Sequence, residues 1–275
     1  MNVLYCGDKN IVDGLIISVL SLLKNVTCKL NVFCLTMDYE NEEKKYEPIT
    51  YGDILVLEKE MKKYNKDNSI KLINITDIVN ECLPEANLNT RFTPYCMLRL
   101  YIDKIEEIPS KILYLDNDVV CYKNPEEFYN IDNSNYELVG VLDYYGSNIY
   151  RKKVFSKDYI NSGVLLLNVD LIKKTHLFEK ARNRCRNVKM LLPDQSALNK
   201  YCKKKLIVSR IYNEQHQENE DTVFRHFTTT FKFWPKVTTQ TIKPWDIDNL
   251  HDILKVHTFD DILEKYIELK KKEEK

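Results

Sequence analysis

The residues that decide the fold are Lys-Ile-Leu-Tyr-Leu-Asp-Asn-Asp-Val-Val at positions 111–120. The apolar run 111–115 predicts a short buried strand, and it leads directly into Asp116, Asn117 and Asp118. Because ligands of parallel sheets bind beyond the carboxyl ends of the strands, this triplet is placed to face a binding site. Two carboxylates at positions i and i+2 can converge on one hard divalent cation, although Asp and Asn are also common in plain turns.

The segments before this strand alternate between strand and helix patterns. Short apolar runs predict strands, and apolar residues at helical spacing predict helices. Strands separated by helices imply right-handed crossovers and a mainly parallel sheet, so the predicted fold class is α/β with a single Rossmann-like domain. Strands are expected at 3–6, 30–35 and 71–75, and helices at 11–24, 52–64 and 95–105.

The second half of the chain is more mixed. Strands are expected at 138–142, 163–169 and 206–208, and helices at 178–189 and 194–203. No internal repeat and no linker rich in Pro, Gly or Ser divides the sequence. The simplest organisation is one domain over residues 1–260, with a mixed but mainly parallel sheet, followed by a polar helical tail over 261–275.

The composition excludes several classes of protein. Forty-one basic residues balance forty-one acidic ones, so the chain lacks the positive excess that nucleic-acid binding needs. No apolar stretch approaches the roughly 20 residues that span a bilayer, and no signal peptide is visible. The eight cysteines include no CxxC pair, which is typical of reduced thiols in the cytoplasm. We therefore expect a cytoplasmic protein with at most peripheral membrane contact, whose oligomeric state the sequence does not indicate.

The triplet and its surroundings resemble the donor-site strand of glycosyltransferase family eight, the glycogenin and lipopolysaccharide galactosyltransferase group. Further stretches match this family in order from about residue 2 to 246. They are Val3 to Asp8 with Asn10, Gly14, Ser18 and Ser21-Leu22; Thr93-Pro94-Tyr95 with Leu98 to Tyr101; Asn161 to Asn168; Asp194-Gln195; His226-Phe227; and Lys243-Pro244-Trp245. The resemblance implies a GT-A type fold, a UDP-sugar donor and a glycan or glycoconjugate acceptor.

The resemblance also implies a role for each matching residue. Asp116, Asp118 and His226 would bind the metal, which the mixed oxygen and nitrogen set makes Mn²⁺ in preference to Mg²⁺. Arg99, Asp194 and Gln195 would lie at the reacting sugar. The donor would also contact Asp8, Asn10, Asn117, Asp143, Asn161, Ser162 and Lys243. From the residues alone, Asp8 is equally well a helix cap, Arg99 a surface residue, Asp143 a strand-end turn residue and His226 a core residue.

The implied reaction is transfer of a hexose, glucose or galactose, with retention of anomeric configuration. Gln195 is an amide and therefore a poor nucleophile, so the resemblance implies front-side attack in which the leaving diphosphate helps to deprotonate the acceptor. A nucleotidyltransferase or sugar-nucleotide hydrolase is an alternative, but the first strand lacks a Gly-rich phosphate loop. A non-enzymatic nucleotide-sugar-binding protein is a second alternative.

One departure from the family pattern concerns Lys243. Sixteen residues without glycine, 227–242, separate it from His226, where the family has a short turn. The sequence therefore leaves open whether Lys243 or Lys232 reaches the diphosphate. Acceptor identity is not readable either, but loops 144–158 and 213–236 are the expected acceptor loops. Their aromatic side chains can stack on sugar rings; they are Tyr144, Tyr145, Phe231, Phe233 and Trp234.

Overall fold

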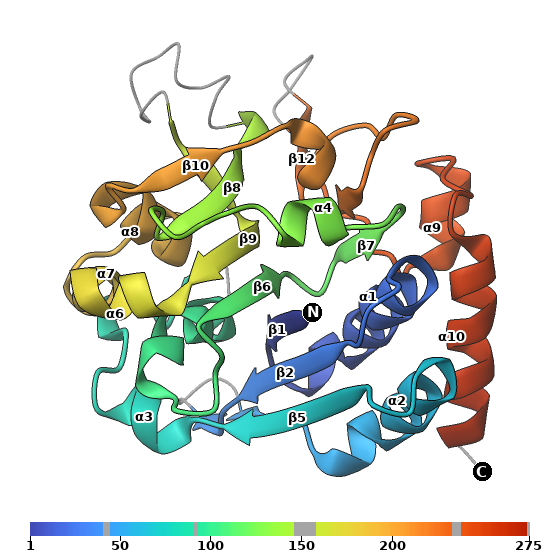
Figure 1. The fold of residues 1–275 in the computed structure, drawn as a ribbon, viewed down its shortest axis with the longest axis horizontal. Helices are drawn as coiled ribbons and strands as arrows, with labels where there is room; N and C mark the ends of the chain where they lie inside the picture. Colours follow the sequence, from blue (N-terminus) through green and yellow to red (C-terminus); the bar gives the residue numbers. More distant parts are fainter. Residues whose placement is uncertain (41–44, 91–92, 146–157, 233–237, 274–275) are drawn as a thin grey trace.

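A seven-stranded mixed sheet forms the middle layer of the molecule (Figure 1). The computed structural model describes residues 1–40, 45–90, 93–145, 158–232 and 238–273. The strand order is β10-β8-β9-β6-β1-β2-β5. The strands are β1 (Asn2–Cys6), β2 (Asn31–Thr36), β5 (Ser69–Asn74), β6 (Lys111–Leu115), β8 (Leu138–Leu142), β9 (Ile160–Asn168) and β10 (Lys205–Ile207). Every strand predicted from the sequence belongs to this sheet, which confirms the α/β fold class.

Strand direction decides which residues meet at one edge of the sheet. β1 pairs in parallel with β2 and β6, whereas β9 runs antiparallel to both β6 and β8. The carboxyl ends of β1, β6 and β8 therefore lie beside the beginning of β9. Asp116, which follows β6, donates its backbone N–H to the carbonyl of Gly163 in β9 at 2.8 Å.

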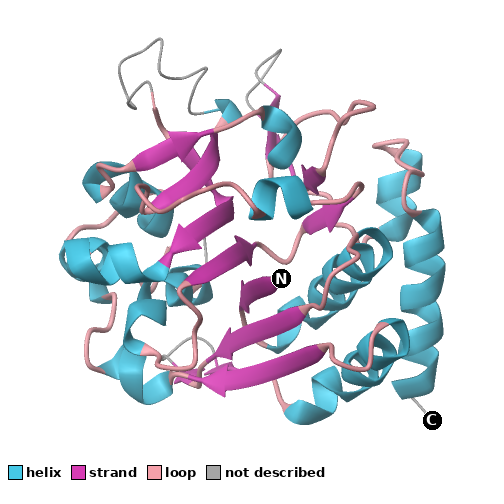
Figure 2. Ribbon diagram, in the orientation of Figure 1, coloured by secondary structure: helices cyan, strands magenta, loops and turns pink. Residues whose placement is uncertain are grey.

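Helices cover both faces of the sheet (Figure 2). One face carries α1 (Val12–Asn25), α2 (Tyr51–Tyr64) and α10 (Asp260–Glu273); the other carries η3 (Pro94–Lys104), α6 (Val169–Thr175), α7 (Leu177–Asn187) and α8 (Pro193–Tyr201). The segment expected as a helix at 95–105 is a 3₁₀ helix. Within it, Nε of Arg99 donates to the carbonyl of Cys96 at 2.8 Å.

The last helix, α10, is amphipathic and docks on the core. Ile262, Leu263 and Leu269 are each less than 5 % exposed. On its polar side, Lys265 pairs with Glu60 of α2 at 3.2 Å. Where the catalytic domain ends along this helix stays a prediction.

Several short elements surround the sheet edge and were not predicted. β7 (Val119–Cys121) pairs antiparallel with β11 (Phe224–His226), and β12 (Thr230–Lys232) pairs with β13 (Thr238–Gln240). The others are β3 (Tyr39–Glu40), β4 (Lys45–Tyr46), α3 (Thr76–Asn80), α4 (Glu126–Tyr129), α9 (Ile247–Asp252), and the 3₁₀ helices η1 (Lys9–Ile11), η2 (Glu85–Asn87) and η5 (Arg210–Tyr212). Each is too short to give a periodic signal.

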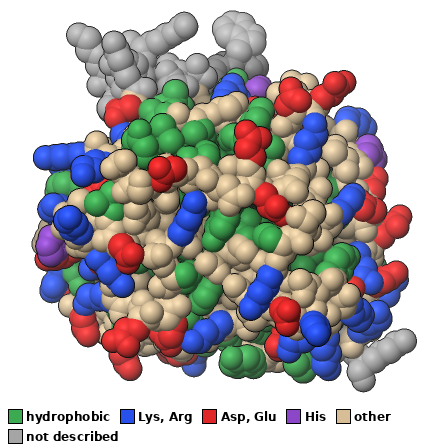
Figure 3. Space-filling view, in the orientation of Figure 1, with side chains coloured by type: hydrophobic (Ala, Val, Ile, Leu, Met, Phe, Trp, Pro, Cys, Tyr) green, Lys and Arg blue, Asp and Glu red, His purple; other side chains and the backbone are tan. Residues whose placement is uncertain are grey.

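The surface follows the balanced charge of the sequence. Basic and acidic side chains are interspersed over the face shown in Figure 3. Among the helices that the structure describes, none has the length and apolar character needed to cross a bilayer.

Candidate active site

A cavity of about 400 Å³ opens at the sheet edge where β1, β6 and β8 end and β9 begins. Segments distant in sequence contribute to its lining because the antiparallel β9 returns to this edge. The cavity gathers most of the residues singled out in the sequence: Arg99, Asp116, Asn117, Asp118, Asp143, Asn161, Ser162, Asp194, Gln195, His226 and Lys243.

Asp116, Asp118 and His226 converge at this edge. Pairing of β11 with β7 places His226 opposite Val119, next to Asp118. The Nε2 atom of His226 lies 3.2 Å from Oδ1 of Asp118 and 3.7 Å from Oδ2 of Asp116. One ligand atom from each of the three residues lies within 4.8 Å of the other two. Two carboxylates and an imidazole form a donor set suited to a divalent first-row metal.

The surroundings of Asp118 fit a bound cation. Its Oδ1 atom is buried and accepts no hydrogen bond from the residues that the structure describes. A buried carboxylate oxygen without a partner is costly, and a cation would satisfy it. The absence of a side chain at Gly163 lets the ligands approach the backbone closely, because a Cβ there would lie 2.2 Å from Cε1 of His226 and 2.8 Å from Oδ2 of Asp116. Donor atoms and backbone thus agree with a metal site.

Lys243 reaches the same carboxylate. Its Nζ donates to Oδ2 of Asp118 and, at 3.2 Å, to the carbonyl of Phe227. The insertion that separates it from His226 forms the β12–β13 hairpin, and the hydroxyls of Thr229 and Thr241 meet at 2.9 Å at its base. The hairpin returns the chain to its starting point, so the longer loop does not carry Lys243 away. Contact of Lys243 with a diphosphate stays a prediction.

These neighbours control the ionisation of Asp118. Burial opposes the carboxylate, but the positive charge of Lys243 and the neighbouring imidazole of His226 outweigh it, so the pKa of Asp118 lies below its ordinary value. The group is therefore an anion at neutral pH, as a metal ligand must be.

Arg99 fixes the orientation of Asp116. The guanidinium is 3 % exposed, so it is not a surface group. It donates to Oδ1 of Asp116 at 2.8 Å and to the carbonyl of Ser162 at 2.5 Å, and it lies over the ring of Tyr114 at 3.9 Å. The Tyr114 hydroxyl donates to the same Oδ1 at 2.5 Å. Both donors occupy one oxygen of Asp116 and leave Oδ2 facing His226.

A second polar chain runs from Asp194 to Asp143. Ser162 Oγ donates to Asp194 at 3.0 Å, and the Ser162 backbone N–H donates to Oε1 of Gln195 at 2.9 Å. Nε2 of Gln195 and Nδ2 of Asn161 both donate to Oδ2 of Asp143, at 3.1 and 3.0 Å. Both ends of the Gln195 amide are held, and Asp143 belongs to this buried network and is more than a strand-end turn residue.

Asp8 and Asn10 differ from the other predicted residues because neither is among the residues that line the cavity. Asp8 caps η1, accepting from the Asn10 backbone at 3.1 Å and from the Asn10 side-chain amide at 2.9 Å. The cavity lining includes their neighbours Gly7 and Ile11. The capping alternative for Asp8 is therefore confirmed, and contact with a base stays a prediction.

Asn213 is a site residue that the sequence did not reveal. It is fully buried; its Oδ1 accepts from Nδ1 of His226 at 3.1 Å, and its Nδ2 donates to Asn161 at 3.0 Å. An amide oxygen can only accept, so it places the imidazole proton on Nδ1 and leaves Nε2 free for a cation. Asn213 lies in the segment expected as an acceptor loop. The sequence marks it only as a polar residue that follows Tyr212, which does not distinguish it from other loop residues.

The expected acceptor aromatics are described only in part. Tyr145 lines the cavity and meets the Tyr144 ring edge-on at 5.0 Å, while Tyr144 stacks on the ring of His216 at 4.6 Å. Phe233, Trp234 and positions 146–157 lie outside the described residues.

Comparisons with known proteins agree with this geometry. Residues 2–238 match the family model described as glycosyl transferase family 8. A glycosyltransferase candidate from Haemophilus influenzae strain Rd is 26 % identical over 259 residues, covering 86 % of this chain and 73 % of the relative. The lipopolysaccharide glucosyltransferase WaaO of Escherichia coli K12 is 26 % identical over 260 residues, covering 85 % and 72 %. The solved structure of a glutamine-to-glutamate active-site variant of LgtC has a TM-score of 0.68 at 15 % identity, covering 99 % of this chain and 96 % of that one.

The mixed sheet with helices on both faces is a GT-A-like α/β fold, as in LgtC. The matched region spans most of the sequence, and the chain belongs to glycosyltransferase family 8. Members of this family typically use a nucleotide sugar and a divalent metal, and the cluster of Asp116, Asp118 and His226 is a possible site for that metal.

Proposed function

We propose that this enzyme transfers glucose or galactose from a UDP-sugar to a saccharide of a surface glycan, with Mn²⁺ bound and with retention of anomeric configuration. The observation that carries the proposal is the convergence of Asp116, Asp118, His226 and Lys243 at the ligand-binding edge of the sheet. Three potential metal ligands beside a cationic side chain suit a donor whose leaving group is a diphosphate.

The donor diphosphate would be held at the metal cluster. A cation bound by Asp116, Asp118 and His226 would neutralise the charge that develops on the leaving diphosphate. Lys243 has its ammonium group at this point, so it can add a second positive charge toward the phosphate oxygens. Arg99 and Tyr114 keep Asp116 in one orientation, which spares the site reorganisation when the donor binds.

The reacting sugar would lie over Gln195, Asp143 and Asp194. The two carboxylates are engaged, Asp143 by Gln195 and Asn161, and Asp194 by Ser162 and the guanidinium of Arg99 at 3.4 Å. Hydrogen bonds of this kind stabilise a carboxylate and reduce its nucleophilicity, which disfavours a double displacement. This supports front-side attack: the acceptor oxygen bonds to C1 as the C1–diphosphate bond breaks, and the acceptor proton passes to the departing phosphate.

The names of similar proteins guide the choice of substrates. WaaO is a lipopolysaccharide glucosyltransferase, and LgtC is a galactosyltransferase solved with donor and acceptor sugar analogues. We therefore expect a hexose donor and a saccharide acceptor here. Tyr145, at the cavity wall, offers an aromatic face to such an acceptor.

The donor site is tested by calorimetry. The purified protein is titrated with a panel of UDP-hexoses in Mn²⁺ and then in EDTA, and the titration is repeated on Asp118→Ala and on Asp221→Ala, whose side chain is 85 % exposed. We expect one UDP-hexose to bind with metal, binding to be lost in EDTA and in Asp118→Ala, and Asp221→Ala to match the wild type. Failure of every UDP-hexose to bind would refute the proposed donor.

The route of transfer is tested by mass spectrometry. We expect no covalent glycosyl-enzyme after incubation with the donor alone, and an NMR spectrum of the product that shows the anomeric configuration of the donor. A hexose found attached to Asp143 or Asp194 would instead establish a double displacement.

A further inference from the structure

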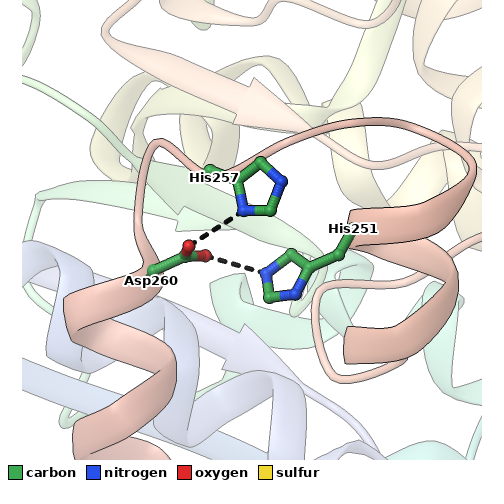
Figure 4. Close-up of side chains that lie close together, drawn as sticks. All are labelled: His251, His257 and Asp260. Atoms are coloured by element: carbon green, nitrogen blue, oxygen red, sulfur yellow. Dashed lines mark hydrogen bonds and ion pairs between the residues drawn. The ribbon is translucent and has the colours of Figure 1, made fainter.

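A second cluster of potential metal ligands lies at the start of the C-terminal helix. His251 belongs to α9, His257 to the connection that follows, and Asp260 begins α10. Figure 4 shows both imidazole rings turned toward the carboxylate of Asp260. Nε2 of His251 is 2.8 Å from Oδ1 and Nδ1 of His257 is 3.0 Å from Oδ2. One ligand atom from each residue lies within 4.8 Å of the other two.

We propose that His251, His257 and Asp260 bind Zn²⁺ at a structural site separate from the catalytic cavity. None of the three lines that cavity, and the proposal does not depend on which sugar the enzyme transfers. Two imidazole nitrogens and one carboxylate oxygen are common zinc ligands, whereas Mg²⁺ and Ca²⁺ prefer sites built from oxygen alone.

The geometry needs little change to accept the ion. Ligand atoms about 2.1 Å from a tetrahedral zinc lie about 3.4 Å from one another. The nitrogen–oxygen distances, 2.8 Å from His251 to Oδ1 and 3.0 Å from His257 to Oδ2, are about half an ångström shorter than this, and side-chain rotation at a partly exposed site can open them and turn the carboxylate toward the ion. The imidazole rings are stacked at 4.4 Å with 23° between their planes, so both approach Asp260 together.

The cluster is also accessible. The side chains of His251, His257 and Asp260 are 30, 58 and 41 % exposed, which leaves a path for the ion and room for a water ligand.

The connection between α9 and α10 is bent so that the ligands meet. Lys255 has a φ of 56°, a left-handed conformation that is uncommon for a lysine. This turn brings His257, in the connection, back beside His251 in α9. A zinc ion there would fasten the end of α9 to the beginning of α10, whose apolar side packs on α1 and α2.

The test isolates this cluster by disabling the catalytic metal site. Zn²⁺ is titrated by calorimetry into Asp118→Ala, and into the same protein carrying His251→Gln, His257→Gln or the control His176→Gln. His176 is also exposed and also pairs with a carboxylate, Glu179 at 2.9 Å, but has no second imidazole. We expect one Zn²⁺ to bind per chain in Asp118→Ala. Adding His251→Gln or His257→Gln should raise the dissociation constant more than about tenfold, because losing a ligand weakens metal binding at least as much as losing an outer-shell partner. His176→Gln should leave it unchanged.

Thermal unfolding gives an independent readout. All variants should melt at similar temperatures in chelator, since the substituted side chains are exposed, and Zn²⁺ should raise the melting temperature except where His251 or His257 is lost. The proposal is overturned if Asp118→Ala binds no Zn²⁺, or if the His257→Gln and His176→Gln proteins bind it equally well.

Discussion

Replacing Gly163 with alanine tests the metal cluster without removing any ligand. The added Cβ would lie 2.2 Å from Cε1 of His226, 2.7 Å from its Nδ1 and 2.8 Å from Oδ2 of Asp116. Carbon atoms in contact stand about 3.5–4.0 Å apart, so the ring must withdraw by more than about 1 Å. It has little freedom to do so, because Asn213 holds its other side and β11 is paired with β7.

We expect the Gly163→Ala protein to fold but to lose metal affinity. Forcing a methyl group into a filled space costs about 1–3 kcal/mol of unfolding free energy. Metal sites depend on ligand positions to within about 0.2 Å, so a displacement of His226 should weaken Mn²⁺ binding by at least the 10–100-fold typical of outer-shell changes. Calorimetric titration with Mn²⁺ and UDP, together with thermal unfolding, measures both effects.

Gly52→Ala is the matched control. Gly52 lies in α2, and its added Cβ would meet only Oγ1 of Thr50 at 3.5 Å, an ordinary contact. This substitution should leave Mn²⁺ affinity unchanged, because Gly52 lies in the first turn of α2 and does not line the cavity. If Gly163→Ala binds Mn²⁺ and UDP as tightly as the wild type, His226 is not a ligand and the reasoning about the cluster fails.

Three further substitutions probe other contacts. Asn213→Ala should weaken Mn²⁺ binding about 10–100-fold while His226 remains in place, measured by calorimetry. Arg99→Lys should lower UDP-hexose transfer and thermal stability, because a lysine cannot reproduce the guanidinium's bonds to several acceptors at once; transfer at the wild-type rate would contradict this. Burial opposes ionisation of Glu60, but its lysine partners outweigh burial and lower the pKa of Glu60 in the folded state. The ionised side chain therefore stabilises the folded protein above the ordinary carboxyl pKa of about 4.3, and this contribution is lost as the pH falls below that value. Glu60→Gln should therefore cost about 1 kcal/mol at pH 7, through the lost pairs with Lys63 and Lys265, and less at pH 4, as judged by urea unfolding.

The sheet could be predicted because its strands are short apolar runs with clear ends. Residues 111–115 are an example: the run stops at a charged triplet, and burial of the strand follows from its composition. The prediction of a metal cluster at Asp116, Asp118 and His226 came from resemblance, since no local pattern connects residues more than a hundred positions apart. The structure brings the three together through pairing of β7 with β11, two strands of three residues that have no signal of their own.

The supporting residues could not be predicted for a related reason. Asn213 and Tyr114 act through side-chain hydrogen bonds whose partners are known only once the chain is folded. The position of Lys243 was open because loop length along the sequence says nothing about whether the ends of the loop meet. The 3₁₀ geometry of η3 could not be predicted either, because apolar residues at helical spacing do not distinguish a 3₁₀ helix from an α-helix.

The β12–β13 hairpin has a consequence for how such an enzyme can diversify. It leaves the body of the protein just after His226 and returns just before Lys243, with Thr229 and Thr241 bonded at its base. Residues beyond that base can be lengthened, shortened or exchanged while both anchor points stay where they are. The hairpin is thus an insertion point beside the candidate active site, at which a loop or label can be grafted while His226 and Lys243 keep their places.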